Sequence, residues 1–326
     1  RIQASGAVFA QLDKLKLFKD TLSIETSFEA DLIKSRNSLE TDFNLSNIIL
    51  TNPKESADIH QINAFFRSDS LFSTLKAEAD FLRVDLKVAH HFADLGKIGK
   101  DYGNYFATFT DPDHINASTR VLELPEIYAT GEITYHNAMS LFIQDTTFRF
   151  NDLGFSIINV PLDQKINYNI RSSGVAYKVV ELGNLNTTVS DSAGILNLQI
   201  VAVDNSINSI PADKFQLISR FAEGQSLTGF TVKDKLDEIV YGLEIGTMLD
   251  SNNIAFTVPS KKLILNREHW QLDTSALMRV NLDTKKILPE LKMHSDSSTL
   301  HLFTESEEGK YTYKGEFGNV RIVSLL

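Results

Sequence analysis

Residues 70–92 read SLFSTLKAEADFLRVDLKVAHHF, and the spacing of the apolar side chains in this stretch decides the fold class. Apolar residues occupy odd positions from Leu71 to Phe81 and even positions from Leu82 to Val88. Alternation of this kind has the period of a β-strand. The stretch predicts one strand about three times the ordinary length of about 5 or 6 residues. The change of phase predicts an irregularity near Phe81 and Leu82, such as a bulge that bends the strand.

The same alternation recurs along most of the chain, at residues 22–32, 39–45, 127–135, 196–202 and 263–272. Each of these segments has one apolar and one polar or charged face, which is typical of antiparallel sheets with one solvated side. Residues 298–323 have the pattern of a hairpin with its turn at Glu308 and Gly309. We therefore expect an all-β fold built from long antiparallel strands.

Two segments depart from this pattern. Residues 89–106 space Phe92, Leu95, Ile98, Tyr102 and Phe106 by three or four, which predicts a short helix that covers an end of the sheet. Residues 232–243 have a similar spacing and predict a second short helix.

The composition excludes several classes of function. The chain has 326 residues, a formal net charge of −10 and no cysteine. An acidic chain without a cluster of Lys and Arg is not expected to bind nucleic acid. The absence of cysteine excludes disulfides and thiolate chemistry. Because the sequence begins at Arg1, we expect a fragment or a processed product, and because it contains no long apolar run, any signal or membrane anchor would lie outside it.

Motifs that carry catalysis or bind metals do not occur in the sequence. It has no HExxH, GxSxG, P-loop or GxGxxG pattern, and its histidines are scattered. We therefore expect no catalytic residue, no metal site and no cofactor. We therefore look for the function of the chain in the apolar faces of its strands.

Two structures account for these faces equally well. Two sheets could bury them against each other in a β-sandwich. Alternatively, one long sheet could curl into a trough whose apolar face is open to an acyl chain, since a continuous apolar strip commonly marks a binding surface.

The order of the segments resembles a known family. Residues 22–86, 124–150 and 261–303 resemble the periplasmic part of TamB-like proteins of the type found in the Bacteroidetes. The resemblance rests on the strand and turn at Asn44 to Pro53, the glycine-containing strand at Gly131 and the strand with the lone Trp270. Residues 232–246 have no counterpart in the family pattern.

The resemblance implies an elongated antiparallel β-taco, that is, a curled β-groove with a hydrophobic interior, that continues over residues 1–326. Such proteins belong to the AsmA-like bridge group, are anchored in the inner membrane and cross the periplasm. They are linked to the transport of phospholipid to the outer membrane and to outer-membrane protein assembly with a BamA-like partner. An enzyme is not implied.

The predicted function is therefore passive transport of acyl chains along the groove, and the alternative is a surface-exposed or secreted β-sandwich module for binding or adhesion. The candidate groove-lining residues are apolar side chains on the alternating strands, namely Leu22, Ile24, Phe28, Phe43, Leu45, Leu75, Ile133, Phe148, Phe150, Leu196, Leu198, Ile200, Leu263, Leu265, Trp270 and Leu272.

Overall fold

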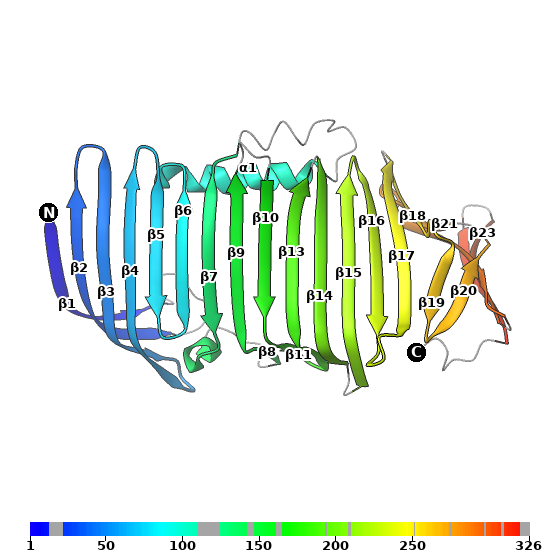
Figure 1. Cartoon of the computed structure of the whole chain (residues 1–326), viewed down its shortest axis with the longest axis horizontal. Helices are drawn as coiled ribbons and strands as arrows, with labels where there is room; N and C mark the ends of the chain where they lie inside the picture. Colours follow the sequence, from blue (N-terminus) through cyan, green and yellow to red (C-terminus); the bar gives the residue numbers. More distant parts are fainter. Residues whose placement is uncertain are drawn as a thin grey trace. The chain divides into compact units, whose positions relative to one another are not determined.

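The structure is a computed structural model, and it describes residues 1–12, 22–109, 124–141, 147–160, 165–192, 194–207, 210–250, 252–273, 276–296, 298–307 and 310–319. The chain divides into two compact units, which are described separately. Unit 1 comprises Arg1–Asp101 and Leu122–Leu185, and unit 2 comprises Tyr102–Val121 and Asn186–Leu326. Both units consist mainly of antiparallel strands, so the predicted all-β fold is confirmed (Figure 1).

Unit 1 contains a row of long strands, each paired antiparallel with the next. In spatial order they are β1 (Ile2–Gln11), β2 (Ser23–Lys34), β3 (Ser38–Thr51), β4 (Ser56–Asp69), β5 (Ser73–Ala79), β6 (Leu82–Val88), β7 (Ile127–Thr134), β9 (Asp152–Val160) and β10 (Lys165–Ser172). The short strands β8 (Phe148–Phe150), β11 (Val175–Tyr177) and β12 (Val180–Leu182) complete the unit.

Unit 2 continues the antiparallel pattern. Its strands are β13 (Asn184–Ser192), whose first two residues belong to unit 1, β14 (Ile195–Ile207), β15 (Ile210–Ala222), β16 (Gln225–Lys233), β17 (Ile239–Asp250), β18 (Asn253–Thr257), β19 (Lys262–Leu265), β20 (Glu268–Leu272), β21 (Ala276–Asn281), β22 (Lys286–His294), β23 (Thr299–Glu307) and β24 (Lys310–Gly318). β23 pairs with β24 with Glu307 opposite Lys310, so the hairpin predicted near the C-terminus is confirmed. Its turn at Glu308 and Gly309 lies outside the described residues.

One long strand was predicted for residues 70–92, and this prediction is wrong. The segment folds into two strands, β5 and β6, joined by the two-residue turn Asp80-Phe81. Ala79 lies directly opposite Leu82, so the two residues share a face of the sheet. The change of phase in the sequence is therefore the mark of a tight hairpin. A two-residue loop and a one-residue bulge both shift the apolar residues from odd to even positions in the sequence, so alternation alone does not distinguish them.

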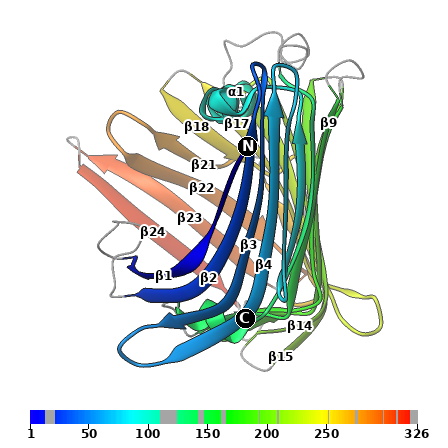
Figure 2. The same ribbon diagram turned by 90° about the vertical axis from the view of Figure 1, so that its left-hand side faces the viewer.

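A real bulge occurs in β3 at Asn47, where the backbone has a φ of 53°. The register between β2 and β3 shifts at this position, which lies opposite Thr26 of β2. The Thr26 hydroxyl donates a hydrogen bond to the Ser46 carbonyl oxygen at 3.1 Å. Before Asn47 the apolar face of β3 carries odd-numbered residues such as Phe43 and Leu45. After Asn47 it carries the even-numbered residues Ile48 and Leu50. Figure 2 shows β2, β3 and β4 bending toward their lower ends, as expected beside a bulge.

The helix predicted at residues 89–106 is confirmed as α1 (Leu95–Ala107), which follows the 3₁₀ turn η1 (Phe92–Asp94). The helix runs across the strand direction (Figure 1). In unit 2, its Tyr105 is buried and donates a hydrogen bond to the carboxylate of Asp191 in β13. This contact joins the second half of the helix to the sheet of that unit.

The second predicted helix, at residues 232–243, is wrong. These residues form the end of β16, a turn and the start of β17, and Val232 lies opposite Tyr241. Asp234 fixes the turn, because its Oδ1 accepts from the backbone N–H groups of Leu236 at 2.9 Å and Glu238 at 3.1 Å. Leu236, which the helix would have buried, is 80% exposed at the turn. Local bonds of Asp with the backbone favour a turn over a helix.

Candidate functional site

The apolar face of unit 1 is organised in rows that run across the strands, since residues directly opposite in an antiparallel pair point to the same side. We call the middle row the central row. It comprises Ala4, Ala30, Phe43, Ala64, Ala77, Val84, Gly131, Phe155 and Ile170, one residue from each strand from β1 to β7 and from β9 and β10. Most of its members are small.

Larger side chains flank the central row on both sides. The row toward the bulge, called the bulge-side row, comprises Gly6, Phe28, Leu45, Ile62, Ala79, Leu82, Ile133 and Leu153. The row on the other side, called the far row, comprises Ile2, Leu32, Thr41, Phe66, Leu75, Leu86, Ala129, Ile157 and Tyr168. The central row therefore lies between two rows of mostly bulkier residues, and we call the three rows together the apolar track.

Much of this track is accessible to solvent. Phe28, Leu45, Leu75 and Ile133 are only half-buried, and the ring of Phe43 is 36% exposed. Half-exposed apolar side chains in adjacent rows make a contiguous apolar surface, which in soluble proteins commonly marks a binding site. These five residues are among the candidates that the sequence predicts.

The two margins of the track are closed. Beyond the bulge, Ile48, Leu50, Ala57 and Ile59 form a buried cluster with Ala138 of the 3₁₀ turn η3 (Asn137–Leu141), and Ile24 and Leu45 pack against it. At the other margin Val88 and Ile166 are buried, and the side chain of Asn159 is also buried and donates to the Pro125 carbonyl at 2.6 Å. Burial also raises the pKa of the Tyr168 phenol in the far row. Leu22, another candidate, is 3% exposed and thus lies within the packed part of the face.

The remaining candidates lie elsewhere. Phe148 and Phe150 are on β8, where their ring centroids are 6.0 Å apart and Phe150 is buried. Leu196, Leu198 and Ile200 are half-buried on β14 of unit 2.

The last four candidates belong to a closed core of unit 2. Trp270 and Leu272 are each 1% exposed, and they cluster with Val258, Leu263, Met293 and Leu300. Leu265 packs against the same cluster. Side chains so completely covered stabilise the fold and do not present a surface to a ligand. The structure thus separates Trp270 and its neighbours from the half-exposed candidates of unit 1.

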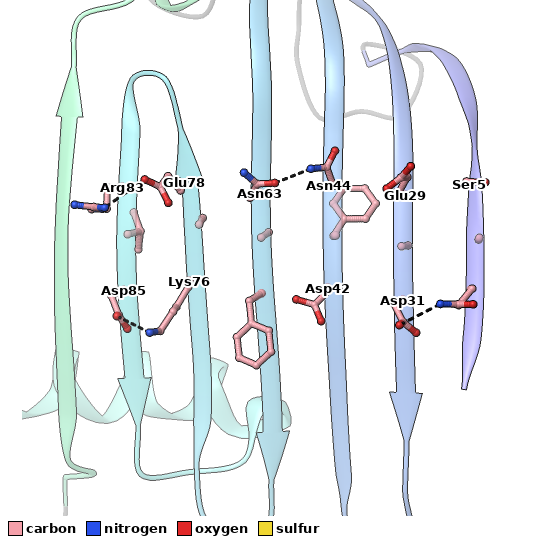
Figure 3. Close-up of a pocket in the computed structure, with 18 residues that line it drawn as sticks. Ser5, Glu29, Asp31, Asp42, Asn44, Asn63, Lys76, Glu78, Arg83 and Asp85 are labelled. Atoms are coloured by element: carbon pink, nitrogen blue, oxygen red, sulfur yellow. Dashed lines mark hydrogen bonds and ion pairs between the residues drawn. The ribbon is translucent and has the colours of Figure 1, made fainter.

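The opposite face of unit 1 is polar and carries a cavity of about 880 Å³ (Figure 3). Two rows of mostly polar side chains line it, one of which includes Phe65, together with residues of the central row between them. Within one row Lys76 forms an ion pair with Asp85 at 3.4 Å, and within the other Arg83 forms an ion pair with Glu78 at 3.3 Å. Asn44 donates to Asn63 Oδ1 at 2.6 Å.

One carboxylate of this cavity is held in its charged form. Arg1 Nε donates to Asp31 Oδ1 at 3.1 Å, and this hydrogen bond lowers the pKa of the Asp31 carboxyl. Asp31 lies directly opposite Asp42 across the β2–β3 pair, so Arg1 also offsets a repulsion between like charges. The exposed position of these groups keeps both effects small.

Within the described residues, no group of three or more His, Asp or Glu side chains could hold a metal ion. None of the described helices is long and apolar enough to cross a membrane.

Sequence reasoning missed the small residues of the central row as part of the site. Ala30 and Ala77 alternate with charged residues just as Leu and Phe do elsewhere, and this regularity is visible in the sequence, whereas Ala64 is followed by Phe65 and Phe66. Only the strand register shows that they lie side by side across the sheet.

Comparisons of the chain with family models, with curated proteins and with solved structures returned no match.

Proposed function

We propose that the chain is a non-enzymatic binding protein whose apolar track in unit 1 holds the acyl chains of a phospholipid. The observation that carries the proposal is the set of mostly half-exposed apolar side chains that flank the central row from β2 to β9. Each CH₂ group moved from water onto such a surface would contribute up to about 0.8 kcal/mol. No chemical step is required.

The direction of the track follows from its small residues. An alkyl chain that lies over Ala30, Ala64 and Ala77 would run across the strands, between the side chains of the two flanking rows. Neighbouring strands follow at about 4.8 Å spacing, and where the row is not Ala or Gly it offers the apolar side chains of Phe43, Val84, Phe155 and Ile170. Sliding from one strand to the next would then exchange one apolar contact for another. This supports passive movement along the sheet.

The setting of the proposal follows from the resemblance to TamB-like proteins. On this basis we propose a periplasmic setting, in a longer protein anchored in the inner membrane, with phospholipid as cargo and a BamA-like outer-membrane protein as a partner. The rival function is binding or adhesion by a β-sandwich module. The continuous pairing of the long strands in unit 1 favours the open sheet over that alternative.

Site-specific photocrosslinking tests the proposal. A photoreactive amino acid at Ala64 would lie on the apolar track, and the same group at Asn63 would lie on the polar face of the same strand. With phospholipid vesicles that carry a radiolabelled acyl chain, we expect lipid adducts at position 64 and few at position 63. Equal labelling at both positions, or none at position 64, would contradict acyl-chain binding on this face.

A further inference from the structure

The turn between β4 and β5 in unit 1 presents two large apolar side chains to solvent. Leu71 is 67% exposed and Phe72 is 37% exposed. Asp69 holds the turn in place, because its Oδ1 accepts hydrogen bonds from the backbone N–H groups of both residues at 2.9 Å. Leu71 therefore projects from a turn whose backbone is fixed by local bonds.

Basic side chains lie at the same end of the sheet. Ser38 at the start of β3 pairs with Asp69 at the end of β4, so the β2–β3 turn neighbours the β4–β5 turn. Both turns lie at the upper end of the strands in Figure 1. Lys34, the last residue of β2, and Arg36, in the β2–β3 turn, are exposed.

The two turns and the residues beside them make a surface that we call the tip of unit 1, namely residues 34–40, residues 67–74 and Lys87. The tip has four basic and two acidic residues, in a chain whose formal net charge is −10. Lys87 Nζ lies 4.7 Å from the centroid of the Phe72 ring, and Arg67 lies in the same cross-strand row, opposite Glu40. Within the described residues, none of the four basic side chains forms an ion pair.

The β16–β17 turn of unit 2 shows what is particular to the tip. It also exposes a leucine, Leu236, and is also fixed by an aspartate, Asp234. Its basic residues, however, are neutralised: Lys233 pairs with Asp237 at 2.9 Å, and Arg267 pairs with Asp234. The tip of unit 1 therefore differs in combining exposed apolar side chains with basic side chains that have no carboxylate partner.

We propose that the tip of unit 1 docks on a membrane surface that contains anionic phospholipid. Leu71 and Phe72 would enter the boundary between headgroups and acyl chains, and the basic side chains would lie at the level of the phosphate groups. The inference does not depend on acyl-chain binding in the apolar track, because the tip and the track have no residue in common.

The size of the apolar surface favours a membrane over an acidic protein. A stable protein interface buries about 800 Å² on each partner, around an apolar centre. Two projecting side chains at a turn do not supply such a centre. A few inserted apolar side chains are sufficient at a membrane surface when electrostatic attraction to anionic lipid adds to them.

Co-sedimentation of the full chain with vesicles tests the proposal. We expect binding to phosphatidylcholine vesicles that contain phosphatidylglycerol, and little binding to phosphatidylcholine alone. Leu71→Ser should weaken binding about tenfold, because a large apolar side chain no longer leaves water. Leu236→Ser is the matched control and should leave binding unchanged. The double variant Lys34→Gln, Arg36→Gln should also weaken binding about tenfold, and so should added salt.

Several results would overturn docking through the tip. These are equal binding to the two kinds of vesicle, no binding to either, and undiminished binding of Leu71→Ser. A loss in the Lys34→Gln, Arg36→Gln variant alone would indicate a purely electrostatic contact, such as an acidic protein makes, and would also overturn it. Phe43→Ser alters the track and not the tip, so it should reduce lipid adducts at position 64 and leave sedimentation unchanged. Failure of docking and failure of acyl-chain binding are thus distinguishable.

Discussion

The ring of Phe155 in β9 lies over the backbone of Gly131 in β7: a Cβ on Gly131 would stand 2.3 Å from Phe155 Cε1 and 2.4 Å from Cζ. The two residues are directly opposite each other in the central row. Glycine is thus required here for the close approach of the ring to the neighbouring strand, and the Phe155 ring fills the space that a side chain at residue 131 would occupy.

Substitution of Gly131 tests this relationship. Gly131→Ala should lower the free energy of unfolding by about 1–2 kcal/mol, because the Phe155 ring must move out of its present position. Gly229→Ala is the control, since a Cβ there meets only the Ile218 carbonyl oxygen at 4.0 Å. Urea unfolding should show no loss of stability for the control, and Phe155→Leu should remove most of the penalty at Gly131.

The bulge at Asn47 supplies a second prediction. Asn47→Gly should be nearly neutral, whereas Asn47→Val should cost about 1–2 kcal/mol, because a β-branched residue is strained at a φ of 53°. Deletion of Asn47 should be more damaging than either substitution, since it would turn Ile48 and Leu50 away from their buried cluster. A deletion variant as stable as the wild type in thermal unfolding would contradict the assigned register.

Trp270 is the chain's one tryptophan and therefore reports on the core of unit 2. Its fluorescence should resist quenching by acrylamide and by phospholipids with brominated acyl chains, because the side chain is 1% exposed. A tryptophan introduced by Phe43→Trp should be quenched by the same lipids. The comparison is best made in a Trp270→Phe background, so that each spectrum reports one site.

Truncation of the same two positions should affect stability differently. Trp270→Ala removes a fully buried side chain and should cost about 3–5 kcal/mol. Phe43→Ala removes a ring that is 36% exposed and should cost much less. The midpoints of urea unfolding would show which of the two substitutions destabilises the protein more. A larger loss for Phe43→Ala would mean that the apolar track is covered in solution.

The turn at Asp234 predicts a dependence on pH. A hydrogen bond from Arg267 lowers the pKa of the Asp234 carboxyl, and backbone N–H groups of Leu236 and Glu238 add to the effect. Because the folded pKa is below the unfolded value of about 3.9, this stabilisation is complete above that value and is lost as the pH falls through the folded pKa. The amides of the turn should exchange faster below that pH. Arg267→Ala should raise the pKa of Asp234 toward its ordinary value, as measured by NMR titration.

Local sequence determined most of the strands, their polar and apolar faces and the helix α1, because the two-residue and 3.6-residue periods depend on neighbouring side chains alone. It wrongly predicted a helix at residues 232–243, where β16, a turn and β17 lie. It could not distinguish the turn at Asp80-Phe81 from the bulge at Asn47. In both places the next apolar residue on the same face follows three positions later, Leu82 after Ala79 and Ile48 after Leu45. Hydrogen bonds with other strands decide between the two, and these join residues far apart in the sequence.

The tertiary structure also decided which apolar faces are closed. Trp270 and Phe43 lie in equally regular alternating segments, yet Trp270 is buried among five other buried side chains, whereas Phe43 is 36% exposed. Alternation in the sequence determines that an apolar side chain lies on the face of its strand opposite the polar residues. What then covers it depends on the bend of the sheet and on the segments that pack against it, and both arise from long-range contacts.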